Sequence, residues 1–148
     1  MKVAIGYKLK EGPWGGGNQF ATALHKKLLD QGHQVFFNLS RNDLDIIILT
    51  DPRKRSSCVS FSSGDIIKYL IFKNPKALVV HRINECDQRK KTLYMNFLLR
   101  LANYSADHTV FIASWLKALN LTQKNIKSSV ILNGEFIKVG SSKPQKTN

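Results

Sequence analysis

Short apolar runs alternate with longer segments of helical periodicity along the chain. Each run is long enough for one β-strand, and the intervening segments repeat their apolar residues every three or four positions. The expected strands are 2–6, 34–39, 46–50, 77–82, 108–113 and 129–132. Strands separated by helices predict the α/β class, here a single Rossmann-like domain with a parallel sheet and helices on both faces.

Four helices are expected between these strands. The first follows a glycine-rich loop and stops at Gly32, and the second is opened by Ser63-Gly64-Asp65 and runs to about Phe72. The third is long and covers about 89–104, and Ser114 is the expected N-cap of a short fourth helix. A stripe in the long helix is expected to pack on the sheet: Tyr94, Phe97, Leu98 and Leu101. The domain is expected over 1–139, and 140–148 should form a basic, disordered tail or linker, because no apolar period continues there.

The formal net charge of the 148 residues is +13. This excess predicts attraction to phosphate-bearing partners, including an anionic membrane surface or a nucleotide-linked substrate, while a solvated basic face with a flexible tail explains it equally well. No nucleic-acid-binding motif or stacking pattern of aromatic residues accompanies the charge, so we expect no nucleic acid partner. Cys58 and Cys86 are expected as free thiols, which suits a cytoplasmic location, with peripheral attachment at the inner membrane surface as a further expectation.

The loop after the first strand contains three consecutive glycines, Gly15, Gly16 and Gly17. In this fold class that loop often holds a phosphate, because its backbone amides and the following helix N-terminus attract anions. The alternative is a flexible cap without a ligand. The loop is about twice as long as a dinucleotide-binding turn, and the second strand ends without an acidic residue, so a nicotinamide or flavin cofactor is not expected.

Polar residues gather where the apolar strand 77–82 ends. His81 is the main candidate for a site residue, and if it enters the cleft it should be partly exposed and close to Gly15–Gly17. The other candidates are less specific, since each also suits a solvated loop, a helix cap or an ion pair: Arg82, Asn84, Asp87, Arg89 and Lys90.

Four stretches taken in order resemble the N-terminal half of family-four glycosyltransferases of the GT-B fold. They are the glycine loop leading to Gly32-His33-Gln34-Val35, then His81-Arg82-Ile83-Asn84, then Ala106 to Leu116, and finally Val130-Ile131-Leu132-Asn133-Gly134. The resemblance covers about residues 1–134. It departs after Asn133-Gly134, where Glu135-Phe136-Ile137 replaces the spacing to aspartate that is usual in the family.

The resemblance implies a retaining transferase that needs neither cofactor nor metal. It implies that amides around Gly16 and Gly17 face the diphosphate of a nucleotide-sugar donor, that His81 is catalytic, and that its neighbours lie toward a sugar or lipid-linked acceptor. Asn133 and Gly134 would lie on the interdomain side. The chain has only three glutamates, so the family's paired-glutamate donor motif is absent, and a C-terminal donor domain or partner chain is expected to be required for activity. The alternative function is a non-catalytic module that binds a phosphorylated or sugar ligand.

Overall fold

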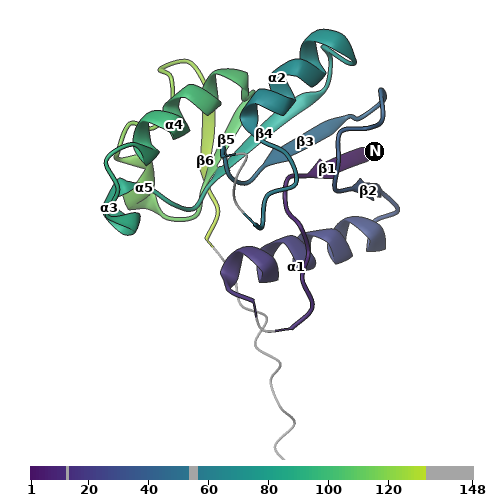
Figure 1. Cartoon of the computed structure of the whole chain (residues 1–148), viewed down its shortest axis with the longest axis horizontal. Coiled ribbons are helices and arrows are strands. Elements are labelled where there is room, and N and C mark those ends of the chain that lie inside the picture. The colour runs from purple at the N-terminus through teal and green to yellow at the C-terminus, as the bar shows by residue number, and fades with distance from the viewer. Residues whose placement is uncertain (13, 54–56, 133–148) are drawn as a thin grey trace, which may run out of the picture.

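A single six-stranded sheet organises the chain (Figure 1). The structure is a computed structural model that describes residues 1–12, 14–53 and 57–132. All strand pairs are parallel, in the order β2-β1-β3-β4-β5-β6. The strands are β1 (Lys2–Ile5), β2 (Gln34–Phe36), β3 (Ile46–Leu49), β4 (Leu78–Ile83), β5 (His108–Phe111) and β6 (Lys127–Val130). The predicted α/β, Rossmann-like class is confirmed.

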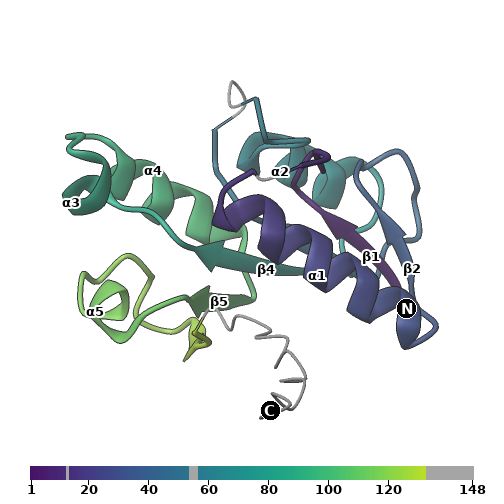
Figure 2. The same cartoon turned by 90° about the horizontal axis from the view of Figure 1, so that it is seen from below.

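Helices cover both faces of this sheet. α1 lies on one face, and α2 and α4 lie on the other (Figures 1 and 2). The helices are α1 (Gly16–Asp30), α2 (Ser63–Phe72), α3 (Asp87–Lys90), α4 (Met95–Ala102), the 3-10 turn η1 (Asn103–Ser105) and α5 (Ser114–Lys117). None of the helices in the described ranges is both long enough and apolar enough to cross a lipid bilayer.

Two buried apolar clusters form the core on the side of α2 and α4. Ile47 and Val79 pack with Ile66 of α2 in one cluster, and Ile83 and Phe111 belong to the other, with α4. The residues alternate along each strand, so successive side chains of β4 face opposite sides of the sheet. This alternation determines which polar residues of β4 face α1 and which face α2 and α4.

Several element boundaries differ from the sequence prediction. β2 stops at Phe36 rather than at residue 39, and β4 runs to Ile83 rather than ending at residue 82. The last strand begins at Lys127, two residues earlier than expected. Ala113 is the N-cap of α5, and Ser114 is its first helical residue, so the predicted capping role of Ser114 is wrong.

The long helix predicted over 89–104 is broken into α3 and α4 by the carboxylate of Asp87. Its Oδ1 accepts hydrogen bonds from the Met95 amide at 2.7 Å and the Thr92 hydroxyl at 2.6 Å, and its Oδ2 accepts from the Asn96 amide at 3.1 Å. Lys91 ends α3 in the left-handed conformation, with φ 53°. Asp87 thus caps the first turn of α4 from outside the helix, which a periodicity pattern cannot reveal.

The stripe expected to pack on the sheet is also corrected. Met95, Leu99 and Ala102 are the buried residues of α4, whereas Tyr94, Phe97 and Leu101 are exposed to solvent. Because α4 is apolar on nearly every side, its sequence alone does not identify which side faces the core.

Candidate functional site

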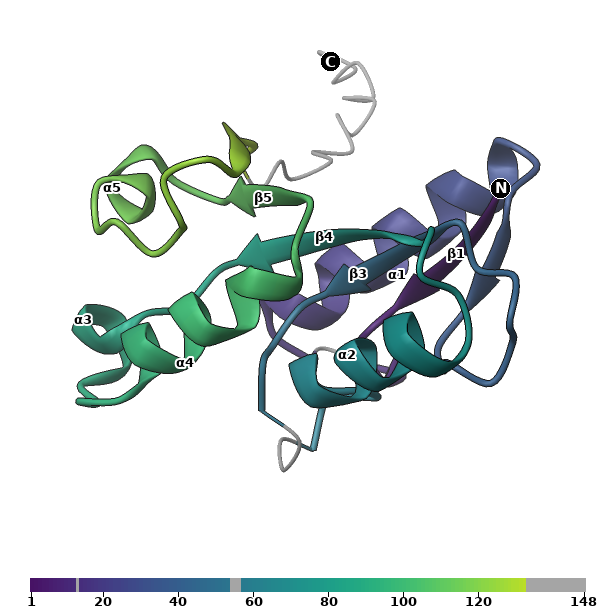
Figure 3. The same cartoon turned by 90° about the horizontal axis from the view of Figure 1, so that it is seen from above.

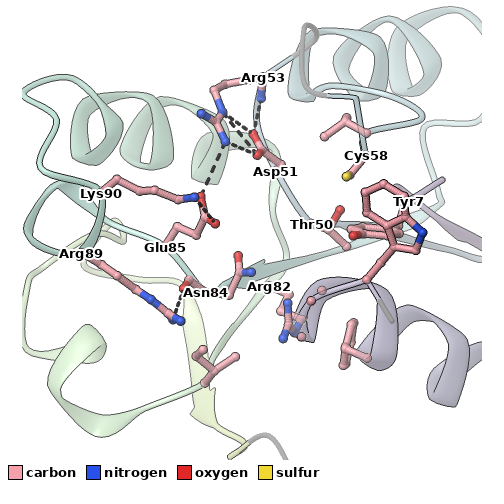
Figure 4. Close-up of a pocket in the computed structure, with 17 residues that line it drawn as sticks. Tyr7, Thr50, Asp51, Arg53, Cys58, Arg82, Asn84, Glu85, Arg89 and Lys90 are labelled. Atoms are coloured by element: carbon pink, nitrogen blue, oxygen red, sulfur yellow. Dashed lines mark hydrogen bonds and ion pairs between the residues drawn. The ribbon is translucent and has the colours of Figure 1, made fainter. Parts of the chain in front are cut away.

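A cavity of about 400 Å³ opens at the carboxyl edge of the sheet (Figure 4). Its walls come from the N-terminus of α1 and from the segments that follow β1, β3, β4 and β5. The lining residues are Tyr7, Trp14, Gly15, Gly16, Gly17, Phe20, Thr50, Asp51, Arg53, Cys58, Val59, Arg82, Asn84, Glu85, Arg89, Lys90 and Ile112. Ligands of doubly wound α/β folds bind at this edge, so the cavity lies where the fold predicts a site.

The predicted glycine loop forms one wall of the cavity. α1 begins at Gly16, and its first amides precede any acceptor within the helix. A side-chain carbon at Gly17 would come within 3.2 Å of the Tyr7 ring, whereas at Gly15 and Gly16 it would meet open space. Of these three positions, packing therefore disfavours a side chain only at position 17. At positions 15 and 16 no side chain covers the backbone, so a ligand could approach it.

Asn18 fixes this loop from inside the protein. Its buried side chain accepts a hydrogen bond from the Lys10 amide at 2.9 Å and donates one to the Lys10 carbonyl at 2.8 Å. The pair closes a ring between the loop and the first turn of α1, so the amides of that turn are held in a defined position.

Arg82 brings a positive charge to the floor of the cavity. It projects from β4 toward α1, its guanidinium lies 3.8 Å from the centre of the Phe20 ring, and its side chain is 3% exposed. Burial lowers its pKa from 12.5 to about 10, because the charged form loses hydration. The group therefore stays charged at neutral pH, in surroundings where its field is weakly screened.

A chain of ion pairs joins the loops after β3 and β4 at the cavity rim (Figure 4). Arg53 contacts Asp51 at 2.6 Å and Glu85 at 3.6 Å, and Lys90 contacts Glu85 at 3.0 Å. The hydrogen bond to Asp51 raises the pKa of Arg53 above its ordinary value. Arg89 donates to the carbonyl of Asn84 at 3.0 Å.

The charges around the cavity are unequal. Among the lining residues that the structure describes, four are basic (Arg53, Arg82, Arg89 and Lys90) and two are acidic (Asp51 and Glu85). The excess of positive charge, together with the start of α1, favours an anionic ligand.

His81 does not line this cavity, and its expected exposure is wrong. It is fully buried, and its Nδ1 lies 3.1 Å from Oδ1 of Asn103 on the α4 side of the sheet. β4 extends two residues beyond His81, so His81 lies within the strand rather than at its end. Alternation then turns Arg82, not His81, toward α1 and the cavity. A catalytic role for His81 stays a prediction without geometric support.

A buried polar network surrounds His81 instead. Oδ1 of Asn103 also accepts from the Thr109 hydroxyl at 2.6 Å, and its amide group donates to Gln123 Oε1 at 2.9 Å. Since Asn103 Oδ1 is an acceptor, Nδ1 of His81 is the donor, and Nε2 carries no proton and finds no partner within the described residues. Burial lowers the pKa of His81 from 6.5 to about 4.

The other predicted site residues divide into three groups. Gly15, Gly16, Gly17, Arg82, Asn84, Arg89 and Lys90 line the cavity together. Asp87 does not, because its carboxylate is used to cap α4. Asn133 and Gly134 lie outside the described residues, as does the expected tail 140–148.

Sequence reasoning missed part of the cavity wall. Asp51 and Arg53 directly follow β3, so the strand-end rule that selected Arg82 could also have selected them. Cys58 had no comparable signal, since only the folded loop brings it to Tyr7. Burial raises the pKa of Tyr7 to about 12, while the hydrogen bond between Ser57 and Cys58 lowers the pKa of the Cys58 thiol.

The described part of the chain contains no cluster of three or more histidine, cysteine, aspartate or glutamate residues that could hold a metal ion. Comparisons with known proteins found no matching family model, no matching curated protein and no matching solved structure.

Proposed function

We propose that this chain is the acceptor-side half of a retaining, metal-independent glycosyltransferase that uses a nucleotide-sugar donor. Activity would require a C-terminal donor-binding domain or a partner chain. The observation that carries the proposal is the convergence of Gly15–Gly17 and Arg82 on one cavity at the carboxyl edge of the sheet. Four stretches that resemble the family-four pattern add to it.

The lining residues suit the charge that develops in such a reaction. When the bond from the anomeric carbon to the donor diphosphate breaks, the leaving oxygen takes the electron pair and becomes negative. The amides of Gly16 and Gly17 and the guanidinium of Arg82 would stabilise that charge without reorganising, because Asn18 and Phe20 already hold them in place. Arg89, Lys90 and Asn84 would contact the acceptor.

A non-catalytic binding module for a phosphorylated or sugar ligand is the second candidate. What favours it is that the described residues lining the cavity, with more basic than acidic side chains among them, all belong to this one chain. Binding would then need no second half. We further propose a cytoplasmic location with peripheral attachment at the inner membrane surface, on the grounds of the +13 charge.

Ligand binding is tested by titration calorimetry of the chain with inorganic pyrophosphate. We expect saturable binding that Arg82→Met weakens by about tenfold or more, since a charge-assisted contact in a weakly screened site is lost. Arg41→Met is the matched control, because Arg41 is exposed beside Asp43 and outside the cavity. Equal binding by Arg82→Met and the unchanged chain would refute the assignment of the cavity.

Glycosyl transfer is tested separately, by joining the chain to a donor-binding half and following product formation from nucleotide sugars. Product from the joined assembly alone supports the transferase. Pyrophosphate binding without product from the joined assembly supports the binding module. Turnover by the isolated chain would contradict the need for a second half.

A further inference from the structure

α4 carries apolar residues on the side away from the core as well as on the side that packs. Leu93, just before the helix, is 100% exposed, and Phe97, Leu101 and Tyr104 are 66%, 55% and 74% exposed. Phe97 and Leu101 are four residues apart in α4 and so lie on one side of that helix, while Leu93 precedes α4 and Tyr104 follows it in η1. A helix that is apolar on two sides usually has a partner on each, yet within the described residues only one side of α4 is covered.

α2 continues this surface on the same face of the sheet. Ile71 and Phe72 at its end are 66% and 81% exposed, and α2 and α4 lie on the same side in two views (Figures 1 and 3). The buried sides of the two helices are connected, because Ala102 at the end of α4 belongs to the same buried cluster as Ile66 of α2. We call the outer surface formed by Leu93, Phe97, Leu101, Tyr104, Ile71 and Phe72 the α2–α4 face.

Basic residues accompany the α2–α4 face, and the acidic residues of the neighbouring helix starts, Asp65 and Asp87, are used as caps of α2 and α4. Residues 66–76 include three lysines and no acidic residue, and residues 88–104 include four basic residues and no acidic one. Lys68 and Lys91 are exposed and form no ion pair with any other described residue. The long aliphatic stems of lysine and arginine can lie along apolar surface while their charges reach outward.

We propose that the α2–α4 face docks on an anionic lipid membrane. Aromatic and leucine side chains flanked by lysine and arginine are the composition of helices that lie in the membrane interface, where the apolar side enters the acyl boundary and the cations contact lipid phosphate. The proposal identifies the surface for the peripheral attachment proposed above, and it does not depend on glycosyl transfer.

Charge complementarity selects lipid over a second copy of the chain. A second copy would bring the same lysines, among them Lys68 and Lys91, to the interface, and like charges facing each other oppose association. An anionic bilayer offers the opposite sign over the whole face. The docked surface would also adjoin the cavity, because Lys90 lines the cavity and precedes Leu93 by three residues.

Vesicle sedimentation tests this surface with matched substitutions. Vesicles of phosphatidylcholine with about one third phosphatidylglycerol are compared with phosphatidylcholine alone. We expect binding to the anionic vesicles that falls as salt rises toward about 0.5 M, because the Debye length shortens. Phe97→Ser and Leu101→Ser should each lower the partition coefficient about three- to tenfold, since part of an apolar side chain no longer enters the bilayer.

Leu29→Ser is the control for Leu101→Ser. Leu29 also lies on a helix and is 49% exposed, but it belongs to α1 on the opposite face of the sheet. Lys68→Glu and Lys26→Glu form the corresponding charge pair, on α2 and α1 respectively, and the substitution on α2 should weaken binding more. Melting temperatures of all variants check that folding is retained.

Each other outcome overturns the inference. If the unchanged chain does not bind anionic vesicles, peripheral attachment fails together with the docking surface. If Leu29→Ser weakens binding as much as Leu101→Ser, the chain binds lipid through another surface, and attachment survives without the α2–α4 face. If sedimentation velocity finds a dimer that Phe97→Ser dissociates, the occupant is a second copy. Pyrophosphate binding is unaffected in every case, so the cavity is judged independently.

Discussion

Acidification should destabilise this protein through His81. Burial depresses the pKa of this histidine from 6.5 to about 4, so between these two values the unfolded chain binds a proton that the folded chain does not. The contribution of neutral His81 to the free energy of unfolding is therefore fully present above about pH 6.5 and is lost as the pH decreases toward 4. The physical reason is that protonation would place a charge on Nε2, which has no acceptor among the described residues.

The size of the effect follows from the two pKa values. At full extent their difference corresponds to roughly 3 kcal/mol, of which about 2 kcal/mol should already be lost at about pH 5. That is a substantial share of the roughly 5–15 kcal/mol by which domains are stable. Urea unfolding of the chain at about pH 7.5 and about pH 5, at constant ionic strength, measures the loss.

His81→Gln isolates the histidine from every other titrating group. Glutamine offers an amide donor for Asn103 but takes up no proton in this range. The variant can be less stable at both pH values, since only the difference between them matters. We expect the unchanged chain to lose about 2 kcal/mol more than the variant on acidification. Equal losses in the two proteins would refute the depressed pKa and the buried network that explains it.

Three further predictions concern the loop, the thiols and α2. Gly16→Ala should keep or slightly raise the melting temperature, because its added carbon meets open space, while pyrophosphate binding measured by calorimetry weakens; unchanged binding would remove the bare backbone from the site. Iodoacetamide should modify Cys58 well before the buried Cys86, as peptide mass spectrometry of the folded chain can show, and equal rates would contradict the described burial. Ser62→Ala should cost about 1 kcal/mol in urea unfolding, since Ser62 and Asp65 form a capping box, and a cost near zero would show that the box contributes little.

The sequence predicted the sheet well because the strands carry their own signal. Ile46 to Leu49 is apolar throughout, as expected of a strand covered on both faces, and the glycine cluster marks the start of α1. These features depend only on neighbouring residues in the sequence, so the pattern of apolar and glycine residues is enough to predict them. The glycine loop at Gly15–Gly17 was selected by the same local evidence combined with the strand-end rule, whereas Arg82 was only one of several less specific candidates.

The failures arose where a single residue acts over a distance. Asp87 ends one helix and starts another through hydrogen bonds to Met95 and Asn96, and nothing in the spacing of apolar residues reports such bonds. His81 was placed in the cleft because the strand was expected to end one residue too early. A shift of one position along a strand exchanges the two faces of the sheet, so Arg82 occupies the place that His81 was expected to hold.

The ion-pair chain at the cavity rim has a consequence for the entropy of ligand binding. Arg53 and Lys90 are long side chains with many rotamers, and immobilising such a side chain on binding costs roughly 0.5–1.5 kcal/mol. Asp51 and Glu85 already restrict both of them in the protein without ligand. An arriving phosphate group would replace a carboxylate as the partner of cations that are already ordered. Most of that side-chain entropy has therefore been lost during folding rather than during binding.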